Sequence, residues 1–355
     1  MEEMKIKNIK NTDEKELLFS LIIPVYNSEK WLDELFTSLL DQGLGHDEYE
    51  IICVNDGSTD NSGEILEEYA QKYPCIRVIH QENARQAAAR NRGLQVAKGR
   101  YVWFIDSDDY ISTNALRFIA SVMDEHQIDE FTVSSSGFLG DKDGYKHEEI
   151  EYVYEPLKEK PELETCSGVK IFRRSIIAEH NIAWEPKLSL CDDVWFLYQF
   201  ELFAKKDVAI KTPIYHYRQR LDSTSHSHTD VVLDKHLFSI KLLGEKYEEI
   251  LKNPPYPLSK QQKKNLQARI NLCTQTLLYD LAIKGDTALQ NEILSELKQA
   301  GRYPYKHIWW NLKPKISLKR TVYDMMMFFF PHERLYRFLG KRLKKKYDKK
   351  HRTEK

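Results

Sequence analysis

Tyr101-Val102-Trp103-Phe104-Ile105-Asp106-Ser107-Asp108-Asp109 is the stretch from which the fold of this chain can be predicted. Its first five residues are apolar or aromatic and rich in β-formers, which is typical of a strand buried on both faces of a parallel sheet. Three carboxylates follow within four residues, and ligands of open parallel sheets bind beyond the carboxyl ends of the strands. Because Mg²⁺ and Mn²⁺ prefer hard oxygen ligands, the pattern favours a seat for a metal–diphosphate. The alternative is an acidic turn that caps the following helix.

The residues before this stretch alternate between expected strands and helices, a rhythm that predicts a parallel sheet. The first strand should end before Pro24, which cannot donate to a ladder, and Asn27 or Ser28 should cap the helix that follows. We expect strands at 17–23, 50–55, 76–80 and 101–105, and helices at 31–40, 62–73 and 86–97.

The second half of the chain predicts fewer strands and more helices. An aromatic stripe at helical spacing in 194–204 indicates core packing rather than a cofactor site. Beyond residue 230 amphipathic helices are separated by Pro and Gly, which predicts a helical subdomain without evident chemistry. We expect helices at 116–125, 194–204, 231–251, 258–284 and 286–300, and strands at 130–138 and 149–154.

Charge and cysteine content exclude several classes of protein. There are 53 Lys and Arg against 54 Asp and Glu, for a net charge of −1. Residues 334–352 alone carry +9, which leaves −10 for the remainder, so a nucleic-acid-binding surface is not expected outside this tail. The five cysteines are odd in number and never form a C-x-x-C pair, which indicates a reducing cytoplasm rather than a disulfide framework or a zinc site.

Four stretches resemble the inverting glycosyltransferases of family 2. They are Leu21-Ile22-Ile23-Pro24-Val25-Tyr26-Asn27, Val54-Asn55-Asp56-Gly57-Ser58-Thr59-Asp60, Ala89-Arg90-Asn91-Arg92-Gly93-Leu94 and Phe104-Ile105-Asp106-Ser107-Asp108-Asp109. The likeness covers roughly residues 17–225. It implies an α/β fold of the nucleotide-diphospho-sugar transferase type (GT-A), with a mostly parallel central sheet between helices, and a bacterial sugar transferase of exopolysaccharide or capsule type.

The resemblance, together with the amphipathic pattern and charge of the C-terminal part, predicts an organisation of the chain. A charged N-terminal extension (1–16) would precede a GT-A catalytic domain (17–230), which divides into a donor-binding half (17–110) and an acceptor half (111–230). A helical subdomain (231–330) and a basic amphipathic tail (331–355) would follow.

Roles for residues at the strand ends follow from the resemblance. Asp56 would recognise uracil and Asp106 the ribose, while Asp108 would ligate a Mn²⁺ or Mg²⁺ ion that bridges the diphosphate. From the residues alone, an Asx turn in which Gly57 supplies a positive φ is an equally good interpretation of Asp56. The remaining donor-binding candidates in this half are Pro24, Tyr26, Asn27, Asn83, Arg90 and Ser107.

Arg85 is a departure from the family pattern. Where such proteins often have Asn-x-Gly, this chain has Asn83-Ala84-Arg85. Glycine lets a backbone approach a ligand closely, so Arg85 either displaces that approach or adds a phosphate or acceptor contact. The alternative is a solvated arginine at the start of a helix.

Two later segments complete the candidate site. Asp192-Asp193 resembles the family's Glu-Asp pair before a helix, which implies that Asp193 is the general base, with Asp192 beside it; the alternative is an acidic helix cap. His216, Arg218 and Arg220 resemble a loop that closes over the diphosphate, since guanidinium groups suit phosphate oxygens. The alternative is an edge strand at 214–217 with solvated basic residues.

The basic tail has two interpretations. Leu335, Leu339, Leu343 and Tyr347 recur every four residues between lysines and arginines, which is typical of a helix lying on an anionic membrane surface. A helix docked on the protein fits the same pattern.

Together these features predict an inverting glycosyltransferase that moves a sugar from a nucleotide-diphospho-sugar, a UDP-sugar by preference, to a glycan or lipid-linked acceptor. We expect it in the cytoplasm, with peripheral attachment to the inner face of the membrane as an option. The absence of the Gln-x-x-Arg-Trp signature of processive synthases favours single additions. The alternative is a non-catalytic sugar-nucleotide-binding component of a glycan-assembly complex.

Overall fold

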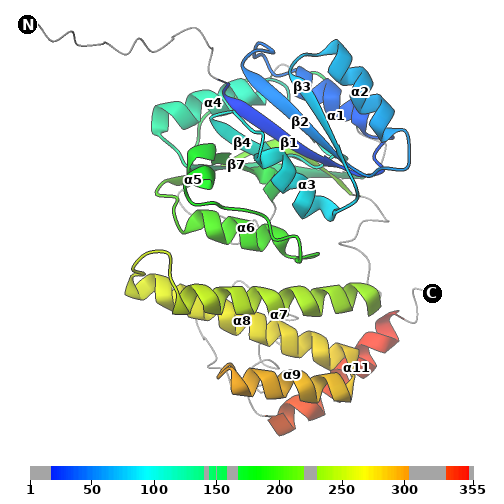
Figure 1. The fold of residues 1–355 in the computed structure, drawn as a ribbon, viewed down its shortest axis with the longest axis vertical. Coiled ribbons are helices and arrows are strands. Elements are labelled where there is room, and N and C mark those ends of the chain that lie inside the picture. Colours follow the sequence, from blue (N-terminus) through cyan, green and yellow to red (C-terminus); the bar gives the residue numbers. More distant parts are fainter. Residues whose placement is uncertain are drawn as a thin grey trace, which may run out of the picture. The chain divides into compact units, whose positions relative to one another are not determined.

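The computed structural model describes residues 17–139, 144–148, 150–157, 167–219, 230–303 and 333–351. They divide into two compact units (Figure 1). The first contains the described residues up to Pro186 and those from Asp192 to Gln219, and the second contains Lys187–Cys191 and the described residues from Asp230 onward. The expected N-terminal extension lies outside the described residues.

The first unit is built on one sheet with the strand order β3-β2-β1-β4-β7-β6-β8-β5. The four strands β3, β2, β1 and β4 are parallel to one another, and β6 is parallel to β8, whereas β7 and β5 pair antiparallel with their neighbours. The mostly parallel sheet predicted from the sequence is therefore confirmed. The strands are β1 (Phe19–Val25), β2 (Tyr49–Asp56), β3 (Ile76–Gln81), β4 (Tyr101–Phe104), β5 (Tyr110–Ile111), β6 (Glu130–Leu139), β7 (Lys170–Arg173) and β8 (Asp207–Gln219).

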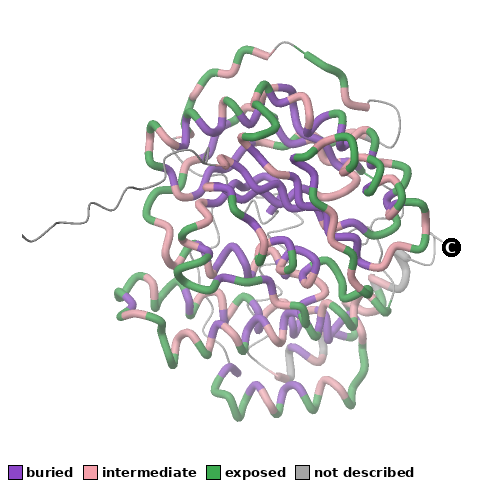
Figure 2. Tube along the Cα trace, turned by 45° about the horizontal axis from the view of Figure 1, so that its top comes forward, coloured by how far each residue is buried: buried purple, intermediate pink, exposed green. Residues whose placement is uncertain are grey.

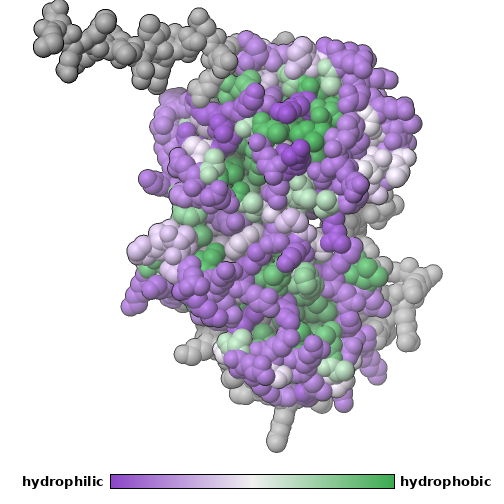
Figure 3. Space-filling model, in the orientation of Figure 1, coloured by the Kyte–Doolittle hydropathy of each residue, from purple (hydrophilic) through white to green (hydrophobic). Residues whose placement is uncertain are grey.

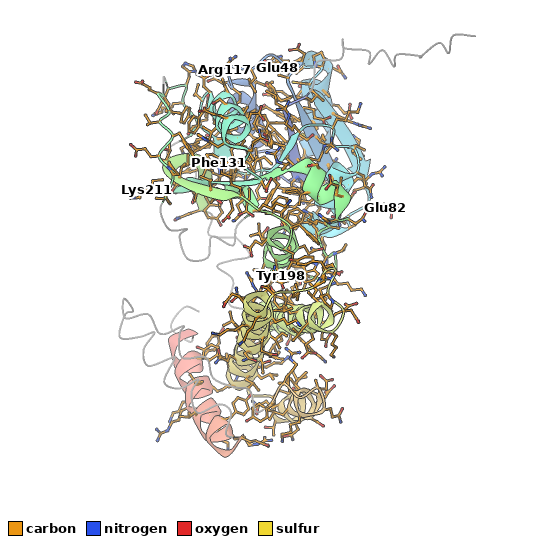
Figure 4. The ribbon with its side chains drawn as sticks, turned by 90° about the vertical axis from the view of Figure 1, so that its left-hand side faces the viewer. Glu48, Glu82, Arg117, Phe131, Tyr198 and Lys211 are labelled. Carbon is orange, nitrogen blue, oxygen red and sulfur yellow. The ribbon has the colours of Figure 1, made fainter. Side chains whose placement is uncertain are left out.

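Helices cover both faces of the sheet, because successive side chains of a strand point to opposite faces. Leu21 and Ile23 of β1 pack in one apolar cluster with α1, α2 and α4, whereas Ile22 packs in a second cluster with α3, α5 and α6. The strands are accordingly the most buried part of the trace (Figure 2). Phe131 of β6 lies inside this unit, while Arg117 and Lys211 lie at its surface (Figure 4). The helices are α1 (Leu32–Leu40), α2 (Ser62–Lys72), α3 (Arg85–Leu94), α4 (Ala115–His126), α5 (Arg174–Glu179) and α6 (Asp192–Glu201).

Pro24 does not end the first strand as predicted, because β1 continues to Val25 with Pro24 opposite Val54. Ile22 accepts a hydrogen bond from the Ile105 N–H on the β4 side. Backbone groups two residues apart in a strand point to the same neighbouring strand, so the N–H that Pro24 lacks would point toward β4, as the Ile22 carbonyl does. The last residue pair of the β1–β4 ladder is Ile22 with Phe104, and Pro24 lies beyond it. The proline therefore removes no ladder hydrogen bond.

Three other local predictions are wrong. The described part of 149–154 is not a strand, and only Pro156 forms a bridge, to Ile210. Neither Asn27 nor Ser28 caps α1, whose N-cap is Trp31 without a side-chain hydrogen bond. The alternative of an acidic cap is also wrong, since α4 begins after Asn114 and has no side-chain cap. Strands β5 and β7 and helix α5 were not predicted from the sequence. These elements have only two, four and six residues, too few to show a clear periodic pattern.

The second unit contains the predicted C-terminal helices, α7 (Asp230–Lys252), α8 (Lys260–Lys284) and α9 (Thr287–Gln299), with α11 (Glu333–His351). Hydrophilic residues cover most of its face in Figure 3. The docked interpretation of the tail is confirmed, since α11 packs on α8, buries Tyr336 and pairs Glu333 with Lys298 of α9 at 2.6 Å. None of the helices described here is long and apolar enough to cross a membrane.

Gly99 is required where the chain enters β4. A Cβ at this position would lie 2.3 Å from the carbonyl carbon of Phe19 and 2.4 Å from the amide nitrogen of Ser20. Because backbone atoms cannot move aside as a flexible side chain can, we expect Gly99→Ala to destabilise the first unit by about 1–3 kcal/mol. The midpoint of urea unfolding, followed by tryptophan fluorescence, measures this loss.

Gly45→Ala is the matched control, because the atom nearest its added Cβ belongs to the exposed side chain of Asp47, which can rotate away. It should change stability by no more than about 0.5 kcal/mol. Equal midpoints for the two variants would show that β1 and β4 do not need the close approach at Gly99.

Candidate active site

The carboxyl ends of β1, β2 and β4 are joined by hydrogen bonds between the loops that follow them. Asn27 Oδ1 accepts a hydrogen bond from the Thr59 N–H at 2.8 Å, which links the first loop to the second. The N–H of Ser28 donates to Ser62 Oγ at 2.8 Å, and Ser28 Oγ lies 2.7 Å from Ser107 Oγ. These contacts place three of the predicted donor-binding segments at one edge of the sheet, with Tyr26 and Asn27 exposed.

Asp56 ends β2 and organises the turn between β3 and α3. Its Oδ1 accepts hydrogen bonds from Gln81 Nε2 at 2.7 Å and from the Ala84 N–H at 2.8 Å, and the residue is buried. Gly57 has a φ of +72°, and a Cβ there would lie 2.8 Å from the amide nitrogen of Asn83. Asp56 and Asn83 are therefore neighbours, and the positive φ expected of Gly57 is confirmed.

Arg85 begins α3 with a φ of +70°, in the left-handed region that glycine adopts readily. The side chain is exposed. The arginine thus keeps the backbone conformation that a glycine would favour, and it carries its guanidinium at the start of α3 beside Asn83 and Ala84.

The acidic turn after β4 is held in place by β8. The buried carboxylate of Asp109 accepts a hydrogen bond from Tyr215 Oη at 2.5 Å and another from the Arg218 N–H at 2.8 Å. Burial, together with the negative charges of Asp106 and Asp108, raises the pKa of Asp109 well above its ordinary value. Asp109 is thereby turned into the protein, while Asp106 and Asp108 are partly exposed.

Arg218 and His216 lie in β8, as the edge-strand alternative predicted in part, although β8 is an inner strand between β6 and β5. Arg218 is buried: its Nε donates to the Asp108 carbonyl at 2.8 Å, its Nη2 pairs with Glu34, and its guanidinium stacks on Trp31. Both ring nitrogens of His216 lie 2.7 Å from serine hydroxyls, those of Ser112 and Ser136. Arg220 lies outside the described residues.

Arg90 connects the acidic turn to the start of α6. Its side chain is 3% exposed, with Nη2 2.8 Å from Asp106 Oδ1 and Nη1 3.3 Å from Asp192 Oδ2 and 3.9 Å from Asp193 Oδ1. The guanidinium carbon lies 4.4 Å from the ring centroid of Trp184, a cation–π distance. The adjacent carboxylates raise the pKa of Arg90, overcoming the effect of its burial.

Asp192 and Asp193 differ in exposure and in their contacts. The Asp192 side chain is 5% exposed and also accepts a hydrogen bond from Gln86 Nε2 at 3.1 Å. The Asp193 side chain is 28% exposed, hydrogen-bonds Ser167, and has an Oδ1 without a hydrogen-bond partner in the described part of the chain. Burial and the nearby charges of Asp192 and Asp106 raise the pKa of Asp193 to about 7, against the opposing effect of Arg90. This value suits a group that exchanges a proton near neutral pH.

The turn after β4 also fits a divalent cation whose ligands would come partly from the protein and partly from a bound phosphate. Two partly exposed residues, Asp106 and Asp108, place negative charge there, and these charges contribute to the raised pKa of Asp109. In the residues that can be described, no three His, Cys, Asp or Glu side chains are grouped to hold a metal by themselves. Mg²⁺ is typically bound by one or two carboxylates together with substrate phosphates, and this donor set fits such a site.

Sequence reasoning missed several residues that support the site. Trp184 stacks on Arg90, Tyr215 holds Asp109, Gln86 holds Asp192, and Ser167 contacts Asp193. Except for Gln86, which lies four residues before Arg90, none of them has a local pattern that would have revealed its role.

Comparison with known proteins agrees with the geometry. Residues 20–205 match the family described as glycosyl transferase family 2. The putative glycosyltransferase EpsH of Bacillus subtilis is 35% identical over 216 residues, which cover 58% of this chain and 61% of EpsH. TarS of Staphylococcus aureus, a poly(ribitol-phosphate) beta-N-acetylglucosaminyltransferase, is 29% identical over 244 residues, covering 66% of this chain and 42% of TarS. The chain thus matches less than two-thirds of the length of either relative.

Solved structures share the fold. The crystal structure of S. aureus TarS aligns with a TM-score of 0.60 at 21% identity, over 90% of this chain and 54% of that one. TarS 1–349 in complex with UDP-GlcNAc aligns with a TM-score of 0.53 at 23% identity, over 82% and 94% of the two chains. The GT-A fold predicted from the four motifs is confirmed. The family match extends over more than half of the chain, and the protein therefore belongs to glycosyl transferase family 2.

Proposed function

We propose that the protein transfers a sugar from a UDP-sugar to a hydroxyl group of a glycan or lipid-linked acceptor, with inversion at the anomeric carbon. The observation that carries this proposal is the Asp193 carboxylate. Its Oδ1 has no hydrogen-bond partner among the described residues, and Arg90, 3.9 Å away, connects it to the acidic turn after β4. The likeness to TarS, whose fragment was solved with UDP-GlcNAc, supports the choice of a UDP-sugar.

In the proposed reaction the Asp193 carboxylate takes the proton of the acceptor hydroxyl while the hydroxyl oxygen bonds to the anomeric carbon. The bond between this carbon and the diphosphate breaks in the same step, so the configuration inverts. Arg90 forms ion pairs with Asp106, which we place on the side of the donor, and with Asp192 and Asp193. It thereby neutralises part of the charge of these carboxylates. Asp192, which is buried and hydrogen-bonded, orients Arg90 and does not reach the acceptor.

Asp108, with Asp106 beside it, would hold a Mn²⁺ or Mg²⁺ ion. Such an ion, when bound, neutralises charge on the leaving diphosphate. Asp109 is unsuited as a ligand, because Tyr215 and the Arg218 N–H occupy its oxygens. Arg218 holds the Asp108 carbonyl and is a positioning residue in this scheme, rather than the phosphate ligand that the resemblance implied.

The two adjacent aspartates should differ in their effect on turnover. A general base contributes about 10² to 10⁴ in rate, so Asp193→Asn should lower kcat by that factor while UDP affinity stays nearly unchanged. Asp192→Asn is the matched control, since it makes the same chemical change on the neighbouring residue, and it should cost less. UDP release with an acceptor measures kcat, and calorimetry measures UDP binding.

The pH dependence provides a second readout. A base must be deprotonated to act, and the pKa of Asp193 is raised to about 7. The kcat/KM of the wild type should therefore rise with pH through the range around 7 and level off above it, and this rise should be missing in Asp193→Asn. Full kcat in that variant, or a product with retained configuration, would exclude Asp193 as the base. UDP-sugar binding without any UDP release would support the non-catalytic alternative.

Metal dependence should reside in the acidic turn. Asp108→Ala should remove the Mn²⁺-dependent part of UDP affinity, because the variant lacks the carboxylate that joins the ion to the protein. Thermal shift with UDP, in Mn²⁺ and in EDTA, reads the ligand-induced stabilisation directly. Asp60→Ala is the control, since Asp60 accepts a hydrogen bond from the Glu29 N–H at the same edge and has no proposed ligand role. Equal stabilisation of the wild type in Mn²⁺ and in EDTA would rule the metal out.

We also propose that α11 brings the protein to an anionic membrane surface. Although it is docked on α8, Lys341, Arg342 and Lys345 are exposed, and each cation near such a surface contributes about 1 kcal/mol. Lys341→Gln/Lys345→Gln should weaken binding to phosphatidylglycerol vesicles by about thirtyfold, the factor for about 2 kcal/mol. Lys260→Gln/Lys263→Gln on α8 is the control with the same charge change. Binding that added salt does not weaken would contradict this proposal.

A further inference from the structure

Cys191, His236 and Asp280 form a hydrogen-bonded row in the second unit, apart from the candidate active site. His236 of α7 places Nδ1 2.7 Å from Oδ2 of Asp280 on α8, and its ring also hydrogen-bonds the Cys191 side chain. Asp280 is 9% exposed and His236 is 32% exposed. The order thiol–imidazole–carboxylate is the arrangement that activates nucleophilic cysteines, because the carboxylate orients the imidazole and the imidazole assists the thiol.

The segment that carries Cys191 is held in an unusual conformation. Cys191 has a φ of +63°, in the left-handed region that residues with a side chain seldom adopt. The preceding residue, Leu190, donates its N–H to Ser239 Oγ of α7 at 3.3 Å. Two contacts with α7 therefore keep this segment in place, and one of them is made by the thiol itself.

The charge on His236 suits a reactive thiol. Its hydrogen bonds with Asp280 and Cys191 raise the pKa of His236 to about 10, so the ring is an imidazolium at neutral pH. The Cys191 side chain therefore lies beside a positively charged imidazole.

The other cysteines in the described ranges lack these features. Cys53, Cys75 and Cys273 are buried, and burial raises the pKa of each thiol, to about 11 for Cys75 and about 12 for Cys273. Cys191 is partly exposed. Cys191 is therefore the most accessible of these four residues, and we expect small reagents to reach it before the buried cysteines.

We propose that Cys191 is a reactive thiol, a site of covalent modification by peroxides and small electrophiles, and that its modification inhibits turnover. The second half of the proposal rests on the proposed function. Cys191 immediately precedes Asp192-Asp193, so a group added to its sulfur replaces the contact with His236 and disturbs the backbone that leads into α6.

The reaction with a peroxide balances without a further reactant. The Cys191 thiolate attacks one peroxide oxygen, a sulfur–oxygen bond forms, and the oxygen–oxygen bond breaks. The sulfur is oxidised by two electrons to a sulfenic acid, and the peroxide is reduced. The hydroxide or alkoxide that leaves takes a proton from the His236 imidazolium.

Alkylation kinetics test the thiol without any assumption about the transferase reaction. The full-length chain is treated with limiting iodoacetamide at pH 7, and the labelling rate of each cysteine is followed by peptide mass spectrometry. Cys191 should react before Cys53, Cys75 and Cys273 in the wild type. In His236→Gln and in Asp280→Asn its rate should fall by about threefold or more, because the first variant lacks the imidazole that assists the thiol and the second lacks the carboxylate that orients this imidazole.

Asp234→Asn is the matched control, since Asp234 lies on α7 two residues before His236 and pairs with Lys284. It should leave the rate unchanged. If His236→Gln fails to fold by circular dichroism, Asp280→Asn decides the result. Labelling of Cys191 at the same rate in the wild type and in the folded variants would overturn the proposed activation.

Peroxide treatment tests the effect on turnover. Dimedone should tag Cys191 in the treated wild type, and UDP release should fall in parallel with the tagged fraction, whereas Cys191→Ser should keep its activity. Equal inactivation of the wild type and Cys191→Ser would overturn the inhibitory role. A chain without any UDP release would contradict the proposed function instead, and the alkylation rates would still decide whether Cys191 is a reactive thiol.

Discussion

The candidate site depends on one buried guanidinium, that of Arg90. A charge with 3% exposure is tolerated only when opposite charges surround it. Here Asp106 supplies one from the turn after β4, and Asp192 and Asp193 supply the others from α6. Removing one partner of a buried ion pair typically costs about 3–5 kcal/mol. Arg90 therefore ties together two segments of the chain that lie more than 80 residues apart, and the proposed base has a defined position because of it.

The three aspartates of the acidic turn after β4 have different partners and different exposure. Asp109 is buried by β8, where Tyr215 and the Arg218 N–H satisfy it. Asp106 is held by Arg90, and the Arg218 side chain holds the Asp108 carbonyl. Asp108 is partly exposed in the turn that follows the strand. Repulsion among the three aspartates is in this way reduced by partners that differ for each one.

Much of the fold could be predicted because its signals are local. The apolar run at 101–105 and the strand–helix alternation before it predict the four parallel strands, and the amphipathic periods after residue 230 predict α7, α8 and α9. The errors arose where pairing across the chain decides the outcome. Pro24 fits within β1 because the β1–β4 ladder ends at Phe104, and His216 and Arg218 belong to a strand that pairs with β6 and β5.

The sequence by itself determined the family, the parallel half of the sheet and the aspartates that stand at its edge, since these follow from neighbouring residues and their order. Only the tertiary structure decided which carboxylates are engaged. Asp192 and Asp193 are adjacent and chemically identical, yet Gln86 and Arg90 hydrogen-bond the first, while Oδ1 of the second has no hydrogen-bond partner among the described residues and lies 3.9 Å from Arg90. The difference comes from α3, which approaches α6 from a distant part of the chain, and burial there changes the pKa of each carboxylate in a way that no local pattern records.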